Sequence, residues 1–198
     1  GFPKCITTCV NDIAMHGIPD DRPLQDGDIV NVDVTVFRDG FHGDTSSMFL
    51  VGKPSREALD LCETARKARD AGIAVCGPGV DFRAVGEAVS RTAAEAGCVI
   101  AAGVCGHGIG NYFHGGPVVL FVANDKNFGV MKPGMTFTIE PLVIEGSDSR
   151  VTCWDDMWTY QSVSGAWSAQ FEHTVLITES GHEVLTGPDV DYKALGQR

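Results

Sequence analysis

A tight hairpin is the feature that most constrains how this chain can fold. Residues 29–37 alternate between apolar and polar, with valines on one face and Asp33 on the other, as in a half-buried strand. Asp39-Gly40 follows, which is the commonest signal for a two-residue turn between antiparallel strands. We therefore predict a second strand over 41–49, in a register that makes Asp44 the diagonal neighbour of Asp33.

The two aspartates of this hairpin would share one polar face. Diagonal neighbours lie about 7–8 Å apart at the backbone and closer at their side chains, so the two carboxylates can converge. Because two bare anions repel each other, either a cation lies between them or one of them holds a proton. The alternative is that both are ordinary solvated acids on an exposed sheet face.

Two glutamates weaken that alternative. Glu140 and Glu172 lie within apolar runs, over 137–144 and 169–177, which we predict to be strands with the glutamate in the middle. An acid in the middle of a buried strand is rarely left unpaired. Structural ion pairs with Lys or Arg are the other interpretation, although few basic residues occur in these runs.

A glycine-rich segment offers an imidazole ligand. His107 has glycines on both sides, which we interpret as a turn that lets the backbone approach a site. Together with the four carboxylates, this imidazole forms a ligand set for two hard divalent ions, and oxygen-rich coordination favours Mn, Fe or Co over a structural zinc. Such a pair of ions can hold a bridging hydroxide and polarise a carbonyl, which indicates a hydrolase.

Beyond the hairpin, the pattern predicts an α+β fold in a single domain over residues 1–198. We expect Ser55 to cap a helix that ends near Gly72, and Asp81 to cap a second helix that ends at Gly97. Later strands are expected over 99–102, 118–122, 136–144, 151–163 and 168–178. The two amphipathic helices would back a mostly antiparallel sheet.

The composition limits the classes of partner. With 26 acidic and 15 basic residues the chain has a formal charge of −11, which argues against nucleic acid or acidic lipid as a partner. No apolar stretch is long enough for a membrane helix, so we expect no membrane interaction. The seven cysteines show no CxxC or zinc-finger spacing, which favours reduced thiols and a cytoplasmic location.

Six motifs spread over nearly the whole chain carry a family resemblance. They are Asn11-Asp-Ile-Ala-Met-His-Gly-Ile-Pro19, Leu24-Gln-Asp-Gly-Asp-Ile-Val-Asn-Val-Asp33, His42-Gly-Asp-Thr45, Gly106-His-Gly-Ile-Gly-Asn-Tyr-Phe-His114, Lys132-Pro-Gly-Met-Thr-Phe-Thr-Ile-Glu-Pro141 and Ser168-Ala-Gln-Phe-Glu-His173. This series resembles that of the type I methionine aminopeptidases, the pita-bread metallopeptidases. The resemblance implies a curved, mostly antiparallel sheet backed by helices. It also implies removal of the N-terminal methionine from nascent proteins and peptides whose second residue is small.

The resemblance assigns the metal ligands one by one. Asp33 would bind one metal ion, and Asp44 and Glu172 would bridge two. His107 and Glu140 would complete the ligands of the second ion. Two divalent ions are thus implied, with Co, Mn, Fe and Zn all open.

The resemblance also assigns catalytic and substrate-binding residues. Glu140 is a candidate proton acceptor, His114 would steady the peptide carbonyl and the tetrahedral oxyanion, and His16 would contact the scissile amide or aid proton transfer. The methionine pocket would be lined by Phe2, Thr7, His16, Phe113, His114, Leu142, Trp158 and Gln170. By periodicity alone, its aromatic members are plain core residues. The segment 156–158 reads Asp-Met-Trp where the family has Asp-Gly-Trp.

The family's further N-terminal helices have no counterpart here, so we expect an N-terminally incomplete catalytic domain. An apolar sheet face would then be exposed, and a partner chain or fragment would supply the missing part. The substrate would be the N-terminus of a peptide or nascent chain, with the ribosome as a further partner. An organellar location would follow if a transit peptide preceded the chain.

Two other functions stay open. One is an Xaa-Pro aminopeptidase or prolidase-like peptidase on the same fold, against which the Phe113-His114 spacing and the His-Gly-Ile-Pro motif speak. The other is a non-catalytic, metal-free binding protein of the pita-bread fold. Such proteins have usually lost metal ligands, whereas all five candidates are present here.

Overall fold

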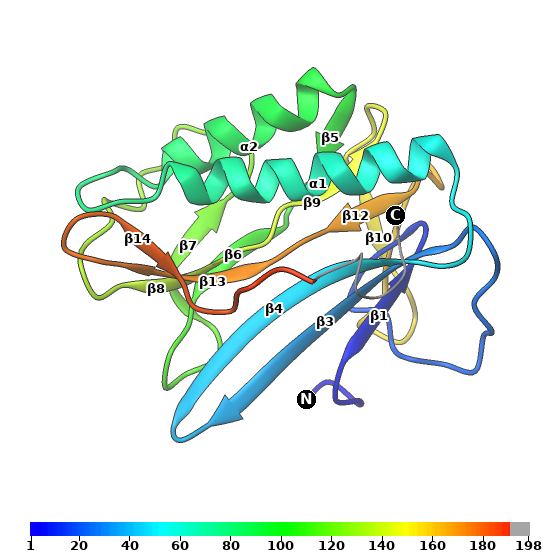
Figure 1. Cartoon of the computed structure of the whole chain (residues 1–198), viewed down its shortest axis with the longest axis horizontal. Coiled ribbons are helices and arrows are strands. Elements are labelled where there is room, and N and C mark those ends of the chain that lie inside the picture. Colours follow the sequence, from blue (N-terminus) through cyan, green and yellow to red (C-terminus); the bar gives the residue numbers. More distant parts are fainter. Residues whose placement is uncertain (191–198) are drawn as a thin grey trace.

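Two helices lie side by side against one face of a curved set of antiparallel strands (Figure 1). The computed structural model describes residues 1–190. The helices are α1 (Arg56–Ala74) and α2 (Arg83–Glu95). The strands are β1 (Thr7–Val10), β2 (Ile13–Met15), β3 (Ile29–Arg38), β4 (Phe41–Leu50), β5 (Cys98–Ile100), β6 (Cys105–Gly108), β7 (Gly115–Leu120), β8 (Thr136–Ile139), β9 (Leu142–Glu145), β10 (Val151–Cys153), β11 (Tyr160–Ser162), β12 (Ser168–Gln170), β13 (His173–Ile177) and β14 (His182–Val184). This arrangement confirms the predicted α+β class.

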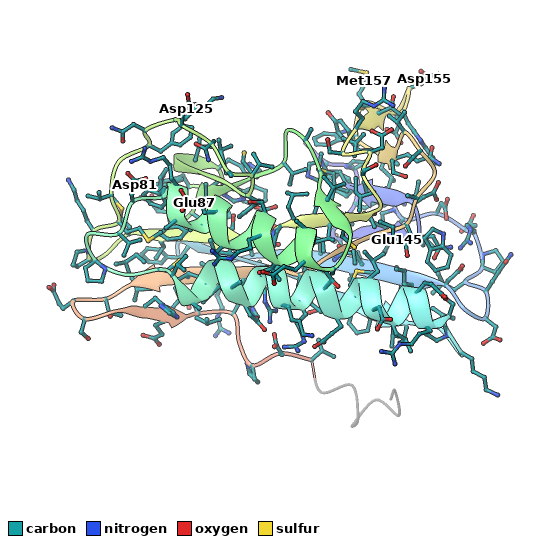
Figure 2. All side chains as sticks on the ribbon, turned by 90° about the horizontal axis from the view of Figure 1, so that it is seen from above. Asp81, Glu87, Asp125, Glu145, Asp155 and Met157 are labelled. Atoms are coloured by element: carbon teal, nitrogen blue, oxygen red, sulfur yellow. The ribbon has the colours of Figure 1, made fainter. Side chains whose placement is uncertain are left out.

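The strands form four small sheets within the described residues. Their orders are β1-β3-β4, β10-β11-β2, β12-β9-β5 and β14-β13-β8-β6-β7. Neighbouring strands in these sheets are antiparallel, as predicted. In the view from above, α1 and α2 lie in front of the strands and cover them (Figure 2). Asp155 and Met157 lie at the outer tip of the loop between β10 and β11 (Figure 2).

The hairpin has the predicted register. Thr35 pairs with Asp44 across β3 and β4, and Arg38 pairs with Phe41 at the end. Asp39 and Gly40 both have a positive φ, 51° and 91°, as a two-residue turn of this kind requires. A local signal in the sequence is thus sufficient to fix how these two long strands meet.

The helix boundaries agree with the sequence except at one cap. Ser55 Oγ accepts a hydrogen bond from the backbone nitrogen of Ala58 (3.1 Å), as predicted for the start of α1. Asp81 is not the cap of α2, because Phe82 takes that position with helical dihedral angles. The Asp81 carboxylate instead accepts from the backbone and the guanidinium of Arg83.

The main core lies between the helices and the strands beneath them. On α1 a row of alanines, among them Ala65 and Ala68, is fully buried and lets the helix approach the sheet closely. Gly72 continues this row, and a Cβ there would lie only 2.9 Å from a methyl group of Val89 on α2. Close packing of this kind holds the sheet rigidly from behind.

Two strands predicted as continuous are each broken at a glutamate. The expected strand 136–144 is β8 and β9, separated at Glu140-Pro141, and 168–178 is β12 and β13, separated at Phe171-Glu172. Pro141 has no N–H for the ladder. The Glu172 nitrogen donates instead to the carbonyl of Ser46 on β4 (3.0 Å). The two glutamates therefore lie where strands change partners, not in mid-strand as predicted.

Other strand predictions also need correction. The expected strand 151–163 is β10 and β11, joined by a loop over 154–159. His107 lies within β6 and not in a turn, because Cys105–Gly108 pairs with β7 and β8. Strands β1, β2 and β14 were not predicted. No helix among residues 1–190 combines the length and the apolar character needed to cross a membrane.

Candidate metal centre and substrate cavity

Two carboxylates of the site come from the hairpin. Asp33 on β3 and Asp44 on β4 lie on the same face, as the register requires. Asp44 is buried, and one of its oxygens accepts a hydrogen bond from Thr35 Oγ1 (2.7 Å). This bond fixes one oxygen of Asp44 and leaves the other free to face the site.

The imidazole comes from β6. His107 Nε2 lies 3.6 Å from an oxygen of Asp44 and 3.6 Å from an oxygen of Glu140. Thr138 on the neighbouring strand β8 connects two of these groups, because its Oγ1 accepts from the His107 backbone nitrogen (3.0 Å) and donates to Glu140 Oε1 (2.7 Å). The ring nitrogen that faces the two carboxylates is thus held in place through the backbone.

Glu172 completes the group. One ligand atom each from Asp44, His107 and Glu172 lie within 4.8 Å of one another, which is a spacing that a metal ion can bridge. Thr45 Oγ1 donates to the backbone carbonyl of Glu172 (2.9 Å), and Thr174 Oγ1 donates to the backbone carbonyl of Asp44 (2.9 Å). These two reciprocal bonds fix the hairpin to the broken strand next to both carboxylates.

The five side chains together are called the acid–histidine cluster below. They are Asp33, Asp44, His107, Glu140 and Glu172. They come from five separate segments, and the structure brings them together as the sequence predicts.

Burial comes first and the crowding of anions second in the electrostatics of the cluster. Burial, followed by the charges of Asp44 and Glu140, raises the pKa of Asp33 to about 8. Burial raises the pKa of Glu140 to about 7 against the opposing charge of His107, and burial with three neighbouring carboxylates raises that of Glu172. Burial lowers the pKa of His107, but Asp44 and Glu140 outweigh it, so the net shift is upward.

This donor set fits divalent metal. Across residues 1–190, the carboxylates of the acid–histidine cluster form no ion pair with Lys or Arg, and the only ion pairs among them involve His107. Four carboxylates and one imidazole without a basic partner hold excess negative charge in a partly buried place. Hard divalent cations neutralise such a set, and oxygen with nitrogen is the donor chemistry they accept.

A cavity of about 580 Å³ opens on the cluster. Six of the eight predicted pocket residues line it, namely Phe2, Thr7, His16, Phe113, His114 and Trp158. The Phe2 ring meets the Trp158 ring edge to face, with centroids 5.4 Å apart. Part of the wall of this cavity is therefore aromatic and apolar, which suits an unbranched thioether side chain.

Two predicted pocket residues lie behind the cavity. Leu142 is fully buried in a small apolar cluster with Ala14 and Val104. Gln170 is buried as well, and its amide nitrogen donates to the backbone carbonyl of Glu140 (2.8 Å). Neither side chain is among those that line the cavity, and their part in a methionine pocket stays a prediction.

Two histidines reach the cavity from loops. His16 has φ 54°, a strained conformation, and the next residue is Gly17, where a Cβ would lie 2.2 Å from the Thr8 carbonyl oxygen. The His114 ring lies 4.4 Å from the His107 ring. The walls of the cavity partly desolvate both rings and lower their pKa, with the charge of His107 adding to the effect on His114. Neutral rings of this kind can donate or accept a proton at a substrate.

Sequence reasoning missed the hydrogen-bonding partners of the cluster. Thr45, Thr138 and Thr174 each bond to the backbone or side chain of a cluster residue. Thr138 and Thr174 lie two residues from Glu140 and Glu172, and His42 lies two residues from Asp44. Spacing by two places side chains on one face of a strand, and that signal was available in the sequence.

Comparisons with known proteins agree with this geometry. The model of metallopeptidase family M24 matches residues 1–179. The chain is 50% identical over 186 residues to "Methionine aminopeptidase 1D, mitochondrial" of Danio rerio, covering 94% of this chain and 54% of that protein. It is 46% identical over 187 residues to a methionine aminopeptidase of Salmonella typhimurium, covering 94% of this chain and 70% of that protein.

The fold comparison gives the same result. The crystal structure of methionine aminopeptidase from Rickettsia prowazekii matches with a TM-score of 0.91 and 39% sequence identity, over 94% of this chain and 75% of that chain. This match confirms the predicted pita-bread fold. The chain spans about half the length of the Danio rerio relative that it matches.

Proposed function

The chain belongs to metallopeptidase family M24, and on that premise we propose that it removes the N-terminal methionine from peptides and nascent proteins. Membership of this family implies divalent metal, and the acid–histidine cluster is the candidate site. The single observation that carries the proposal is that these five side chains line one cavity together with a pair of aromatic rings, Phe2 and Trp158.

We propose that the cluster holds two ions. Asp33 would bind one ion, His107 and Glu140 the other, and Asp44 and Glu172 would bridge them. Bound divalent ions supply Lewis-acid polarisation of a carbonyl and lower the pKa of an attacking water. The number of carboxylates supports two ions, because one divalent ion would leave the group with a net negative charge.

The other groups act directly on the substrate. Glu140, whose Oε1 accepts a hydrogen bond from Thr138, would accept a proton from the attacking water. His114 would donate to the oxygen of the peptide carbonyl as negative charge develops there. His16, on the cavity wall, would contact the scissile amide and transfer a proton to the departing amine.

The cavity supports methionine as the first residue. Phe2, Phe113 and Trp158 present aromatic rings to it, and sulfur makes favourable contacts with ring edges. We propose a small residue at the second position of the substrate, as in the resembled family. We propose that the protein acts in the cytoplasm, although the names of several relatives place those proteins in mitochondria or chloroplasts. We also propose the ribosome as a partner. Microscopy of a tagged chain and co-sedimentation with ribosomes test these two points.

Activity is tested on two kinds of peptide with each metal in turn. Purified chain loaded with Co, Mn, Fe or Zn should release methionine from Met-Ala-Ser and leave Ala-Pro-Ala intact. Cleavage of the proline peptide alone would favour the prolidase-like alternative. Asp44→Ala should lose both activity and metal, measured by mass spectrometry. Asp125→Ala, in an exposed loop (Figure 2), is the matched control and should lose neither. Full metal content in Asp44→Ala would contradict the assignment of the site.

A further inference from the structure

A row of aromatic rings connects the hairpin to the acid–histidine cluster. The Phe37 and His42 rings have centroids 4.6 Å apart, and the His42 ring is parallel to that of Phe113 within 9° at 5.5 Å. Phe113 stacks on His114 at 3.9 Å, and His114 meets His107 edge to face at 4.4 Å. Neither the sequence nor the proposed mechanism assigns a role to Phe37 or His42, and His42 is the one of the two that stacks on Phe113.

His42 also binds the loop that carries two of these rings. The loop over 109–114 follows β6, and the carbonyl oxygen of Gly110 accepts two hydrogen bonds from His42. One comes from the backbone nitrogen (2.8 Å) and the other from ring Nδ1 (3.1 Å), which must carry the proton because a carbonyl can only accept. The loop is thus fixed to β4 two residues before Asp44.

The position of His114 depends on its neighbours in the row. In the described part of the chain, the His114 ring makes ring contacts with Phe113 and His107, and no hydrogen bond to its nitrogens is present. More than a third of the Phe113 side chain is exposed, so Phe113 is not held by a surrounding core. The contacts that limit its movement are the rings on either side in the row and the anchored loop.

We propose that His42 is a positioning residue, which holds His114 over the acid–histidine cluster through Phe113 and the Gly110 carbonyl. The proposal rests on the proposed function, in which His114 contacts the substrate carbonyl. The histidine side chain supplies both elements of this hold, a flat ring face and an N–H. All variants keep the backbone bond to Gly110. Phenylalanine at this position would add only the ring face to it, and asparagine would add only a side-chain N–H.

A double-mutant cycle with His114 tests whether His42 acts through that ring. His42→Ala should lower kcat for Met-Ala-Ser by about 10- to 100-fold with little change in KM, because a misplaced group loses transition-state contact more than ground-state binding. In the His114→Ala background the same change should lower kcat by less than about twofold. Equal losses in both backgrounds would overturn the proposal.

Conservative variants separate positioning from simple destabilisation. His42→Phe and His42→Asn should each recover part of the kcat lost in His42→Ala, while the temperatures of unfolding stay close to that of the wild type. His182→Ala is a matched control, because His182 Nδ1 also bonds a backbone carbonyl, that of Cys76 (2.9 Å), but from β14, which belongs to another sheet. It should leave kcat unchanged. If His42→Ala does not fold, the Phe and Asn variants carry the test alone, and full activity in both would overturn the proposal.

A nuclear magnetic resonance measurement tests the positioning without any activity. Stacking on Phe113 should shift the ring protons of His114 away from their values in an unfolded chain, and His42→Ala should return them towards those values. Unchanged shifts would contradict the proposal. If the wild type releases no methionine, the proposed function fails, and the chemical shifts still decide whether His42 fixes His114.

Discussion

The hairpin and the two broken strands contribute to the acid–histidine cluster in different ways. Asp33 and Asp44 meet because a two-residue turn sets the register of β3 and β4. Glu140 and Glu172 meet them only after β8 pairs with β13 and the Glu172 backbone pairs with β4. The first half of the site therefore needs only local pairing, and the second half needs the assembled sheet.

This difference indicates that metal binding by the cluster would depend on the assembly of the whole fold. A bound ion would connect a locally formed hairpin to segments that are more than ninety residues away in the sequence. Metal and folding are coupled in such a case, because binding energy adds to the stability of the assembled state only. Substitutions in either half, or in the hydrogen bonds between the two halves, should show how strongly metal binding depends on each.

Loss of a proposed metal ligand from the long-range half should have the largest effect. Glu172→Gln keeps the size of the side chain but removes its charge, so we expect at least about a 100-fold loss of methionine release and loss of bound metal. The metal-free variant should unfold at the same temperature as the metal-free wild type or higher, because one buried anion is removed from a crowded group. Asp33→Asn makes the same change in the local half. A Glu172→Gln variant that retains metal and activity would show that the two halves do not act as one site.

Loss of the threonine connection should have the next largest effect. Thr174→Val removes the hydroxyl that bonds to the Asp44 backbone while keeping the shape of the buried side chain. We expect metal affinity, measured by calorimetric titration, to fall by about 10- to 100-fold. Thr64→Val is the control, since Thr64 is also buried and donates to a backbone carbonyl, that of Asp60 (2.7 Å), but on α1. Equal loss of affinity in both variants would point to general destabilisation.

The sequence predicts the hairpin half of the site better than the half that depends on long-range pairing. The turn chemistry of Asp39-Gly40 and the alternation before it were sufficient for the register of the hairpin, and the motifs placed the five cluster residues. The breaks at Glu140 and Glu172 were missed, because apolar periodicity does not show where a strand changes partner. The pocket roles of Leu142 and Gln170 came from the resemblance alone, and both residues lie next to such a break, where a change of partner resets which face a residue occupies.

A buried ion-pair network holds the strand that follows Glu172. The Arg69 guanidinium on α1 bonds to both oxygens of Asp189, and Asp189 also bonds to His173 Nε2 (2.9 Å). Asp189→Ala removes one of the two carboxylates that bond to the buried Arg69 guanidinium. The other carboxylate, that of Asp70, stays in place. We expect the free energy of unfolding to fall by about 1–2 kcal/mol, reduced because the Asp189 side chain is 46% exposed. Urea denaturation of wild type and variant measures this difference.

The same pair gives a pH dependence with a defined sign. Burial alone would raise the pKa of Asp189, but Arg69 outweighs it, so the pKa lies below its usual value. The pair therefore contributes its full stability above the unfolded-state pKa and loses it as the pH falls through the lower folded-state pKa. The difference between wild type and Asp189→Ala should shrink on acidification below about pH 4. A constant difference down to about pH 2 would exclude this ion pair as its source.

The smallest expected effect comes from a second tight turn, which lacks the glycine found in the hairpin. Met157 has φ 64° where the hairpin turn has Gly40, and its side chain is 77% exposed at the outer tip of its loop (Figure 2). The Asp156 carboxylate accepts from the backbone nitrogens of Trp158 and Thr159, so the turn keeps its shape without a contribution from the Met157 side chain. Met157→Gly should therefore stabilise the chain by about 0.5–1 kcal/mol by relieving left-handed strain.

Two measurements make this last prediction specific. Met157→Ala keeps a Cβ and hence the strain, so its urea midpoint should stay near that of the wild type while that of Met157→Gly rises. Because Trp158 lines the cavity from this turn, methionine release by the glycine variant shows whether the local change reaches the site. Since Asp156 fixes the backbone of Trp158 independently, we expect kcat/KM to stay unchanged. Equal midpoints for the glycine and alanine variants would mean that the left-handed residue costs the fold nothing, and the analogy between the two turns would then fail.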